Sequence, residues 1–344
     1  MDYMQNKSGS TGRKGTGHTP LLTGRARLIV SVLLFAAFLL VSVLQRMGED
    51  PADRQEAWQE NGTWQDGGAG QGFTSRSGGE TSMEVHFIDV GQGDATLILC
   101  DGAAMLIDCA DSSQGTRIQD YLQKQGVEKL DYLVLTHPDS DHIGGAPVII
   151  EKFEIDRVFM SNFEKSNKTY MKVIQSLDNR LLKWSTPEVG STWQLGSAQF
   201  TILAPNGTYS DPNEASIALV IQNGDNTFLF TGDAEEKAEE DMLENGLDLH
   251  ADVYQAGHHG SRTSSKEEFL DEVAPVYAVI SCAEGNSYGH PHAATLNKFR
   301  ERGIQVFRTD EQGSIVAVSD GTTITWNCAP SDTWKAGEPT GSGR

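Results

Sequence analysis

A six-residue stretch of the chain holds four side chains that bind divalent transition metals. His137, Asp139, Asp141 and His142 follow an apolar run, and Gly144–Gly145 come directly after them. Imidazole nitrogen and carboxylate oxygen are both ligands of such metals. Alternating positions on a turn can aim two pairs of ligands at two ions, and the glycines let the chain turn closely. The spacing therefore predicts a metal site where a buried strand ends.

Other polar residues in Gly- or Pro-rich segments are secondary candidates. Asp94 lies in GQGDA, where glycines let the backbone approach an anion or a metal, although a turn residue that holds backbone amides is the alternative. Asn213 and Ser216 either touch metal or substrate, or cap the next strand. Asn286 and His290 lie in a loop after the run YAVIS. A positioned imidazole there could protonate a leaving group, so a catalytic role is predicted for His290.

The elements that must position these groups follow from the hydrophobic pattern. Strands are predicted at residues 85–90, 95–100, 104–108, 132–136, 157–160, 199–203, 217–221, 227–231, 252–256, 277–281 and 304–308. Helices are predicted at residues 117–125, 234–244, 266–273 and 294–302. Two strand-rich halves, each with helices, predict an α/β fold of two sheets packed face to face with helices outside.

The N-terminal part of the chain has the pattern of a membrane anchor. Residues 28–44 contain no charge, Gly or Pro, and in a helix they would span roughly 25 Å. Basic residues before this run and acidic residues after it predict an N-terminus inside the cell. We expect a single-pass cell-membrane protein with an extracytoplasmic catalytic domain, while a cleaved signal peptide would give a secreted one. The predicted organisation is a cytoplasmic tail (1–27), a transmembrane anchor (28–45), a flexible linker (46–82), a folded domain (83–328) and a disordered tail (329–344).

Composition limits the partners and the kind of metal site. The chain has 27 Lys+Arg against 48 Asp+Glu, a formal net charge of -21. A broad phosphate-binding surface is normally basic, so overall charge gives no support to a nucleic-acid role. The candidates for a basic strip beside the site are Lys165, Lys168, Lys172 and Arg262. The four cysteines form no CxxC pair, which excludes a zinc ribbon.

The ordered motifs resemble a known family. The sequence HPDSDH at residues 137–142 is similar to the metallo-β-lactamase superfamily signature HxHxDH, in the form HxDxDH. Asp108, Asp233 in TGD and the histidines of GHHGS, which ends at Ser261, follow in that family's order. FIDVGQGDA at residues 87–95 and NSYGHPH at residues 286–292 resemble, more narrowly, the metallo-hydrolase domain of late-competence DNA-uptake proteins of the ComEC type. The resemblance covers residues 83–328.

The resemblance implies a metallo-β-lactamase αββα sandwich with two divalent metal ions. The second histidine of the signature is Asp139, and the third metal-binding histidine is absent, so the site is expected to be richer in oxygen. Zinc and manganese are both expected, with magnesium also open. Asp108 would orient the motif loop, with Asp94, Asn213, Ser216, Ser261 and Asn286 near metal or substrate. The implied ligands are His137, Asp139 and Asp233 for one ion, and Asp141, His142, Asp233 and one of His258 or His259 for the other.

The function implied by the resemblance is metal-dependent hydrolysis. A metal-bridged hydroxide would attack a phosphodiester bond, with Asp141 assisting as a general base. Nucleic acid, including DNA, is the favoured substrate class, and a small-molecule or wall-polymer phosphoester is the rival. A catalytically degenerate binding module in a DNA-uptake assembly is the alternative outside the enzyme class. The membrane is the expected partner of the N-terminal helix, and the sequence identifies no protein partner.

Overall fold

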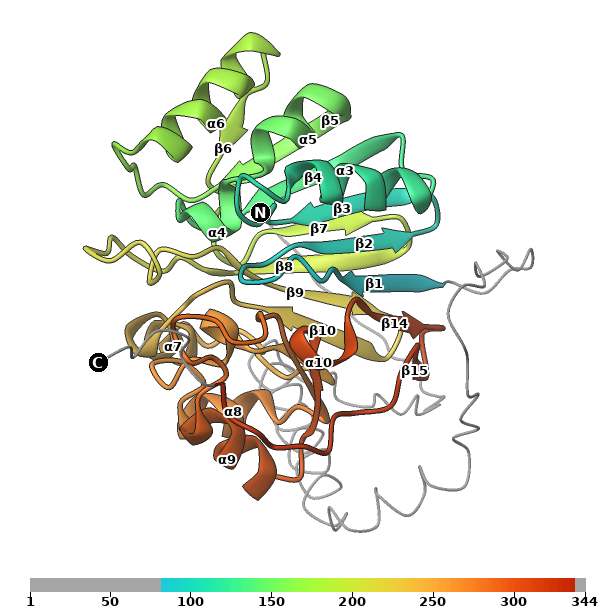
Figure 1. Ribbon diagram of the computed structural model, residues 1–344, viewed down its shortest axis with the longest axis vertical. Helices are drawn as coiled ribbons and strands as arrows, with labels where there is room; N and C mark the ends of the chain where they lie inside the picture. Colours follow the sequence, from blue (N-terminus) through green and yellow to red (C-terminus); the bar gives the residue numbers. More distant parts are fainter. Residues whose placement is uncertain (1–81, 338–344) are drawn as a thin grey trace, which may run out of the picture. The chain divides into compact units, whose positions relative to one another are not determined.

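Two mixed β-sheets lie face to face in the computed structural model, which describes residues 82–337 (Figure 1). The strand order of the first sheet is β15-β14-β1-β2-β3-β4-β5-β6, and β3 to β6 are parallel. Its strands are β1 (Met83–Phe87), β2 (Thr96–Cys100), β3 (Ala103–Ile107), β4 (Lys129–Leu135), β5 (Glu154–Met160), β6 (Trp184–Ser185), β14 (Ile315–Ser319) and β15 (Ile324–Trp326).

The second sheet has the order β13-β12-β11-β10-β9-β8-β7. Strands β10 to β13 are parallel, whereas β7 to β10 form antiparallel pairs. Its strands are β7 (Thr192–Leu195), β8 (Ala198–Ala204), β9 (Ala218–Asn223), β10 (Asn226–Phe230), β11 (Val253–Gln255), β12 (Tyr277–Ile280) and β13 (Gln305–Arg308).

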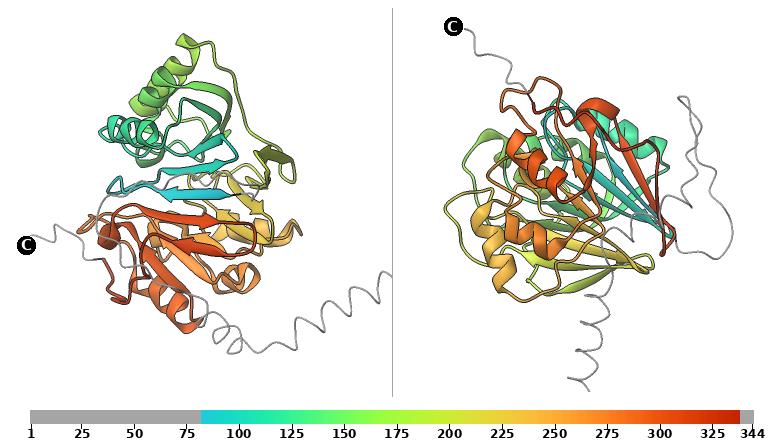
Figure 2. Two further views of the ribbon diagram at one scale, coloured as in Figure 1. Left: turned by 90° about the vertical axis from the view of Figure 1, so that its right-hand side faces the viewer. Right: turned by 90° about the horizontal axis from the view of Figure 1, so that it is seen from below.

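Helices cover the outer face of each sheet (Figures 1 and 2). The first sheet carries α3 (Gly115–Lys124), α5 (Ala146–Lys152) and α6 (Lys168–Asn179), and the second carries α7 (Glu236–Glu244), α8 (Glu267–Val273) and α9 (Ala293–Glu301). Shorter helices are α4 (Ser140–Ile143), η1 (Gly257–Gly260) and α10 (Thr309–Gln312). The predicted arrangement of sheets between helices is therefore confirmed.

Three apolar clusters hold these layers together. The central cluster joins the two sheets, with Phe87 of β1 stacked on Phe230 of β10 at a ring-centroid distance of 6.2 Å. The outer clusters lie under the helices, as where α3 buries Ile118 and Leu122 on one face. Because strands such as β2 pack on both faces, they are apolar along most of their length.

Helix α6 is the main element that the sequence analysis did not predict. Its buried residues Tyr170, Val173 and Leu177 are spaced as one face of a helix. The side chain of Asn167 caps its first turn by accepting a hydrogen bond from the Tyr170 amide at 2.8 Å. This apolar spacing was a usable signal of a helix that the prediction overlooked.

The C-terminal boundary differs from the prediction. Residues 329–337, predicted to belong to a disordered tail, lie against the domain: the Ser331 amide donates to the Val306 carbonyl at 2.7 Å, and Trp334 packs against the outer cluster of the second sheet. The predicted anchor at residues 28–45 lies outside the described residues. No helix within residues 82–337 is long and apolar enough to cross a membrane.

A buried carboxyl group in α7 makes stability depend on pH. Glu239 is fully buried and accepts hydrogen bonds from the amides of Ser265 and Lys266 at 2.6 and 2.8 Å. Burial raises the pKa of Glu239 to about 8, despite these donors. The pKa of Glu239 is higher in the folded than in the unfolded protein. The protonated side chain therefore makes its full contribution to the free energy of unfolding at pH 4, and this contribution is lost as the pH rises to about 8.

We therefore expect Glu239→Gln to remove a pH-dependent part of the unfolding free energy, on the order of a few kcal/mol between pH 5 and 8. Urea unfolding of both proteins at pH 5, 7 and 9 measures it. The difference in stability between wild type and variant should change steadily with pH. Parallel pH profiles would show that Glu239 keeps an ordinary pKa.

Candidate metal centre

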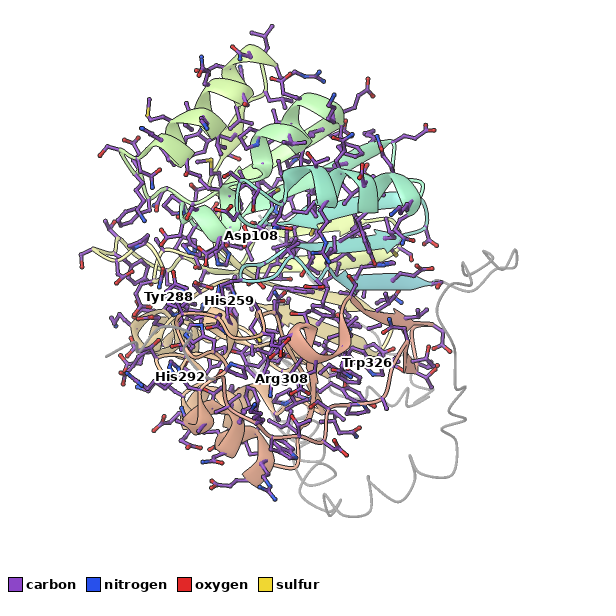
Figure 3. The ribbon with its side chains drawn as sticks, in the orientation of Figure 1. Asp108, His259, Tyr288, His292, Arg308 and Trp326 are labelled. Carbon is purple, nitrogen blue, oxygen red and sulfur yellow. The ribbon has the colours of Figure 1, made fainter. Side chains whose placement is uncertain are left out.

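The candidate ligands lie in loops that follow parallel strands. In each sheet the carboxyl ends of these strands meet at one edge. In the first sheet, the HPDSDH loop follows β4 and Asp108 follows β3, its parallel neighbour. In the second sheet, Asp233 follows β10, and His258 and His259 follow β11. Figure 3 shows Asp108 on the side of the first sheet and His259 on the side of the second. The fold thus brings together residues more than a hundred positions apart in the chain.

Asp233 is the centre around which four histidines converge. Its Oδ1 lies 3.1 Å from His142 Nε2 and 3.6 Å from His259 Nε2. Its Oδ2 lies 3.8 Å from His137 Nε2 and 3.6 Å from His258 Nε2. Each carboxylate oxygen therefore faces its own pair of imidazoles, which is the arrangement expected of a carboxylate that bridges two positions.

The other ring nitrogen of each histidine is held by the protein. His142 Nδ1 donates to Asp108 Oδ2 at 2.7 Å, and His258 Nδ1 donates to Glu235 Oε1 at 2.8 Å. The backbone carbonyl of Ser281 and the hydroxyl of Thr136 hold His259 and His137 at 3.0 and 3.2 Å. With Nδ1 bound, each Nε2 points at Asp233 in the orientation of a metal-ligating histidine.

Several of these converging atoms lack a hydrogen-bond partner. Within the described residues, the buried Nε2 atoms of His137, His142 and His259 and Oδ1 of Asp233 have none. Buried polar atoms are normally paired, and a cluster of unpaired imidazole and carboxylate atoms has the donor set of a divalent metal. The residues present therefore fit metal ions.

Asp94 joins this group more closely than predicted. Ligand atoms of Asp94, His142, Asp233 and His259 all lie within 4.8 Å of one another, and all four residues are buried. Gln255 Nε2 holds Asp94 Oδ1 at 2.8 Å. Asp94 was predicted as either a site carboxylate or a turn residue, and its position favours the site.

The loop that carries Asp94 packs directly on the HPDSDH loop. The Asp94 amide donates to the Asp141 carbonyl at 3.2 Å. Gly93, with φ +128°, has a backbone so close that a Cβ would lie 2.3 Å from the Asp141 carbonyl oxygen. A side chain at this position would push the two loops apart, so glycine is required there.

Asp141 and Asp139 have different surroundings. Asp141 Oδ2 lies 3.5 Å from His259 Nε2, which places Asp141 on the Oδ1 side of Asp233. Asp139, predicted as a ligand, instead forms an ion pair with Lys165 and lies outside the compact group of four. Both members of this pair are about one-third exposed. In this structure Asp139 is thus bound by a lysine from the segment between β5 and α6.

The charges in the site are strongly coupled. Burial opposes the charge on Asp233, but His142 and His259 hold the pKa of Asp233 well below its usual value. Burial likewise disfavours a charged His259, yet Asp233 and Asp94 raise its pKa to about 9. A metal ion that binds here must therefore displace a proton from His259, so binding strengthens as pH rises.

His290 lies beside the histidine cluster with a neutral ring. Its ring centroid is 5.3 Å from that of His258, and its buried Nδ1 has no partner. Burial and the nearby His259 and His258 lower the pKa of His290 to about 3. Without metal the imidazole is therefore neutral at neutral pH, and the role of His290 as a leaving-group acid stays a prediction.

The remaining predicted residues hold the loops around the site through hydrogen bonds. Ser216 Oγ accepts from the Asp233 amide at 3.2 Å, and Ser261 Oγ pairs with Thr263 Oγ1 at 2.9 Å in the turn after η1. Asn213 helps to lower the pKa of the Glu235 carboxyl, after the larger effect of His258. Asn286 holds the backbone of the loop that carries His290.

Glu235 and Gln255 were not among the site residues predicted from the sequence. Glu235 contacts both His258 and Thr263, and Gln255 contacts Asp94. Glu235 lies two residues after Asp233, and Gln255 three before His258, so proximity to the motifs was the only signal. His86 lies away from the site and pairs with Tyr121 and Glu84.

Asp108 is expected to control the HPDSDH loop, since its carboxylate accepts from the Thr136 amide, the Thr136 hydroxyl and His142 Nδ1. The Thr136 hydroxyl and His142 Nδ1 both donate to Asp108 Oδ2. Asp108→Asn replaces the carboxylate by an amide, which has only one oxygen that can accept these hydrogen bonds. We expect metal affinity to fall about 10- to 100-fold. Isothermal titration calorimetry of the metal-free protein with metal measures this affinity. Asp89→Asn, a substitution in the neighbouring loop, is the matched control. Unchanged affinity would show that Asp108 supports only the fold.

Comparison with known proteins places the chain in one superfamily. The family model of the metallo-beta-lactamase superfamily matches residues 88–284. ComE operon protein 3 of Bacillus subtilis is 31% identical, over 67% of this chain and 32% of its own length. Recombination protein 2 of Haemophilus influenzae is 32% identical, over 68% of this chain and 28% of its own length. Competence protein ComA of Neisseria gonorrhoeae is 33% identical, over 69% of this chain and 32% of its own length. The chain thus spans about a third of the length of these relatives.

Proposed function

Because the chain belongs to the metallo-β-lactamase superfamily, we propose that it is a metal-dependent hydrolase of phosphodiester bonds, with nucleic acid as the favoured substrate. The observation that carries this proposal is the convergence of four imidazoles on the two oxygens of Asp233. One relative is named a competence protein and another a recombination protein, which supports a substrate related to DNA. An extracytoplasmic location, through an anchor at residues 28–45, remains part of the proposal.

Two groups of residues would hold the ions. His137 and His258 would share one with Asp233 Oδ2, and His142, His259, Asp141 and Asp94 would share the other with Asp233 Oδ1. Both His258 and His259 face Asp233, which makes the site richer in nitrogen than its motif suggests. This composition suits zinc or manganese better than magnesium.

The chain's own residues have separate tasks in hydrolysis. Bound divalent ions lower the pKa of water and polarise the phosphoryl group. Burial opposes the charge on Asp141, but His259 and His142 lower its pKa, so this carboxylate is ionised and can accept a hydrogen bond that orients an attacking water, although the lowered pKa makes it a weak base. The neutral His290 can hydrogen-bond an oxygen of the substrate through its unpaired Nδ1.

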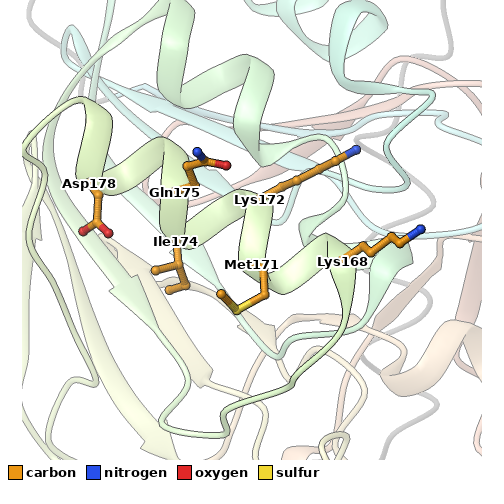
Figure 4. A pocket seen from close by; sticks show the side chains of 6 residues that line it. All are labelled: Lys168, Met171, Lys172, Ile174, Gln175 and Asp178. Carbon is orange, nitrogen blue, oxygen red and sulfur yellow. The ribbon is translucent and has the colours of Figure 1, made fainter.

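Lysines beside the site support a polyanionic substrate. Lys165 contacts Asp139 of the HPDSDH loop, and α6, which follows it, packs against α4 of the same loop. Lys168 and Lys172 line a hollow of about 350 Å³ on α6 together with the exposed Met171 (Figure 4). Lys165 is paired with Asp139 and Asp178 also lines the hollow, so Lys168 and Lys172 are the cations that a phosphate group could contact there.

The proposal is tested with the full-length protein, stripped of metal and reloaded with Mn²⁺, Zn²⁺ or Mg²⁺. Its substrates are bis-p-nitrophenyl phosphate, single-stranded DNA and poly(glycerol phosphate), and His250→Ala, an exposed residue away from the site, is the control. Metal-stimulated cleavage of DNA supports the proposal, whereas preference for the glycerol polymer would favour a wall-polymer enzyme. A folded protein with no bound metal and no turnover would indicate a binding module.

A further inference from the structure

Tyr288 is an exposed aromatic residue in the loop that carries His290. Its side chain is 60% exposed, and the other large apolar side chains found exposed within the described residues are Met171, Leu181 and Val276. Tyr288 follows β12, and Figure 3 shows it on the same side of the domain as His259 and His292. A single exposed tyrosine is common on a protein surface, so exposure by itself does not indicate a binding site. The contacts of Tyr288 are therefore needed to infer its role.

A short series of ring contacts connects Tyr288 to Asp233. The Tyr288 ring is stacked on the His290 ring, with centroids 5.5 Å apart and an angle of 19° between the planes. His290 meets His258 edge to face at 5.3 Å, and His258 Nε2 lies 3.6 Å from Asp233 Oδ2. One face of Tyr288 is therefore covered by His290, two ring contacts away from the metal centre.

The loop holds Tyr288 in place. The Asn286 side-chain oxygen accepts from the amides of Tyr288 and His290 at 3.1 and 3.0 Å, and its nitrogen donates to the His290 carbonyl at 2.6 Å. The His292 amide donates to the Gly260 carbonyl at 3.0 Å, which ties the loop to η1. Fixing the loop in advance lowers the conformational entropy lost when a ligand binds.

The neighbouring His290 supplies the second observation. This ring is 4% exposed, and its Nδ1 has no hydrogen-bond partner. A buried polar atom without a partner, beneath an exposed aromatic ring, points to a ligand that has both a flat apolar face and polar atoms. A nucleotide has both, whereas a polymer of glycerol phosphate has no flat face.

We propose that the free face of Tyr288 stacks an unpaired nucleobase beside the scissile phosphate, so that the substrate is a single strand of nucleic acid. This inference rests on the proposed phosphodiester hydrolysis. A base in a duplex is already stacked on both faces, so only an unpaired base is available to the tyrosine. Stacking of one base on an aromatic side chain contributes about 1–3 kcal/mol, equivalent to about a 5- to 100-fold change in affinity.

The test compares two oligonucleotides of equal length and charge, one of thymidines and one of abasic deoxyribose phosphates. The Kd of each is measured by fluorescence anisotropy on the full-length, metal-free protein, and KM on the metal-loaded protein. The variants are Tyr288→Ala and Tyr288→Phe, which keeps the ring. Val276→Ala, an exposed apolar residue at the opposite end of β12, is the matched control.

We expect Tyr288→Ala to raise Kd and KM for the thymidine strand about 5- to 100-fold and to leave Kd for the abasic strand at its wild-type value, while Tyr288→Phe restores binding of thymidines. Equal losses on both strands, or no loss on either, would overturn the inference. Turnover of bis-p-nitrophenyl phosphate by wild type is measured in parallel. Its absence would refute the proposed hydrolysis, whereas its presence beside a base-independent Kd would refute only the role of Tyr288.

Discussion

Asp233→Asn should lower kcat/KM for a phosphodiester by roughly a thousandfold or more, because bound metal supplies several kcal/mol of transition-state stabilisation. The amide keeps the size of the side chain but offers one oxygen in place of two. Since each oxygen of Asp233 faces a different pair of histidines, the variant loses the shared ligand of both positions. Steady-state kinetics with elemental analysis measure both effects.

Asp141→Ala tests the ligands on one side of Asp233 alone. Its carboxylate lies on the Oδ1 side, near His259, so the variant should lose turnover while keeping more metal than Asp233→Asn. Unchanged thermal unfolding would separate loss of chemistry from loss of fold, with His250→Ala again as the control. Activity that survives in both Asp141→Ala and Asp233→Asn would refute a centre with two metal ions.

His258→Ala and His259→Ala should each remove about one equivalent of metal. Both imidazoles lie 3.6 Å from Asp233, but on different oxygens, and each is held at Nδ1 by its own acceptor. Loss of one ligand from either group is expected to lower turnover at least about 100-fold. His258 is also more exposed than His259, so its ion should exchange faster.

The result separates two ligand assignments. The resemblance implies that only one of the two histidines is a ligand, whereas in the proposed centre one lies on each side of Asp233. Inductively coupled plasma mass spectrometry on the two purified variants measures the stoichiometry. Two equivalents of metal retained in His258→Ala, with a raised KM, would show that His258 contacts substrate instead. Glu235→Gln, which alters the partner of His258 Nδ1, should follow the behaviour of His258→Ala.

The motif positions were predictable from sequence because each follows an apolar strand. Asp108 is the last residue of a predicted strand, His137 directly follows one, and Asp233 and His258 come two residues after theirs. Parallel strands bring their carboxyl ends to one edge of a sheet. Binary patterning also identified most strands, since the two sheets bury them on both faces. Strands β6, β7 and β15 were missed because they are short and partly exposed, whereas β14 is an apolar run whose signal the prediction overlooked.

Contacts between distant side chains were not predictable. The HxDxDH spacing indicates Asp139 as a ligand, but its pairing with Lys165 depends on how the segment before α6 folds back over the loop. Likewise, the division of His258 and His259 between two oxygens depends on their backbone, in which both residues have positive φ values of 50° and 55°. Adjacent residues in a regular strand would point to opposite faces, so only this turn brings both rings to Asp233.

The most direct test of the account is an anomalous difference map from crystals of the protein grown with Mn²⁺ or Zn²⁺. The account predicts two peaks, one beside Asp233 Oδ1 among His142, His259 and Asp94, and one beside Oδ2 between His137 and His258. A single peak, or a peak that does not contact Asp233, would contradict the proposed centre.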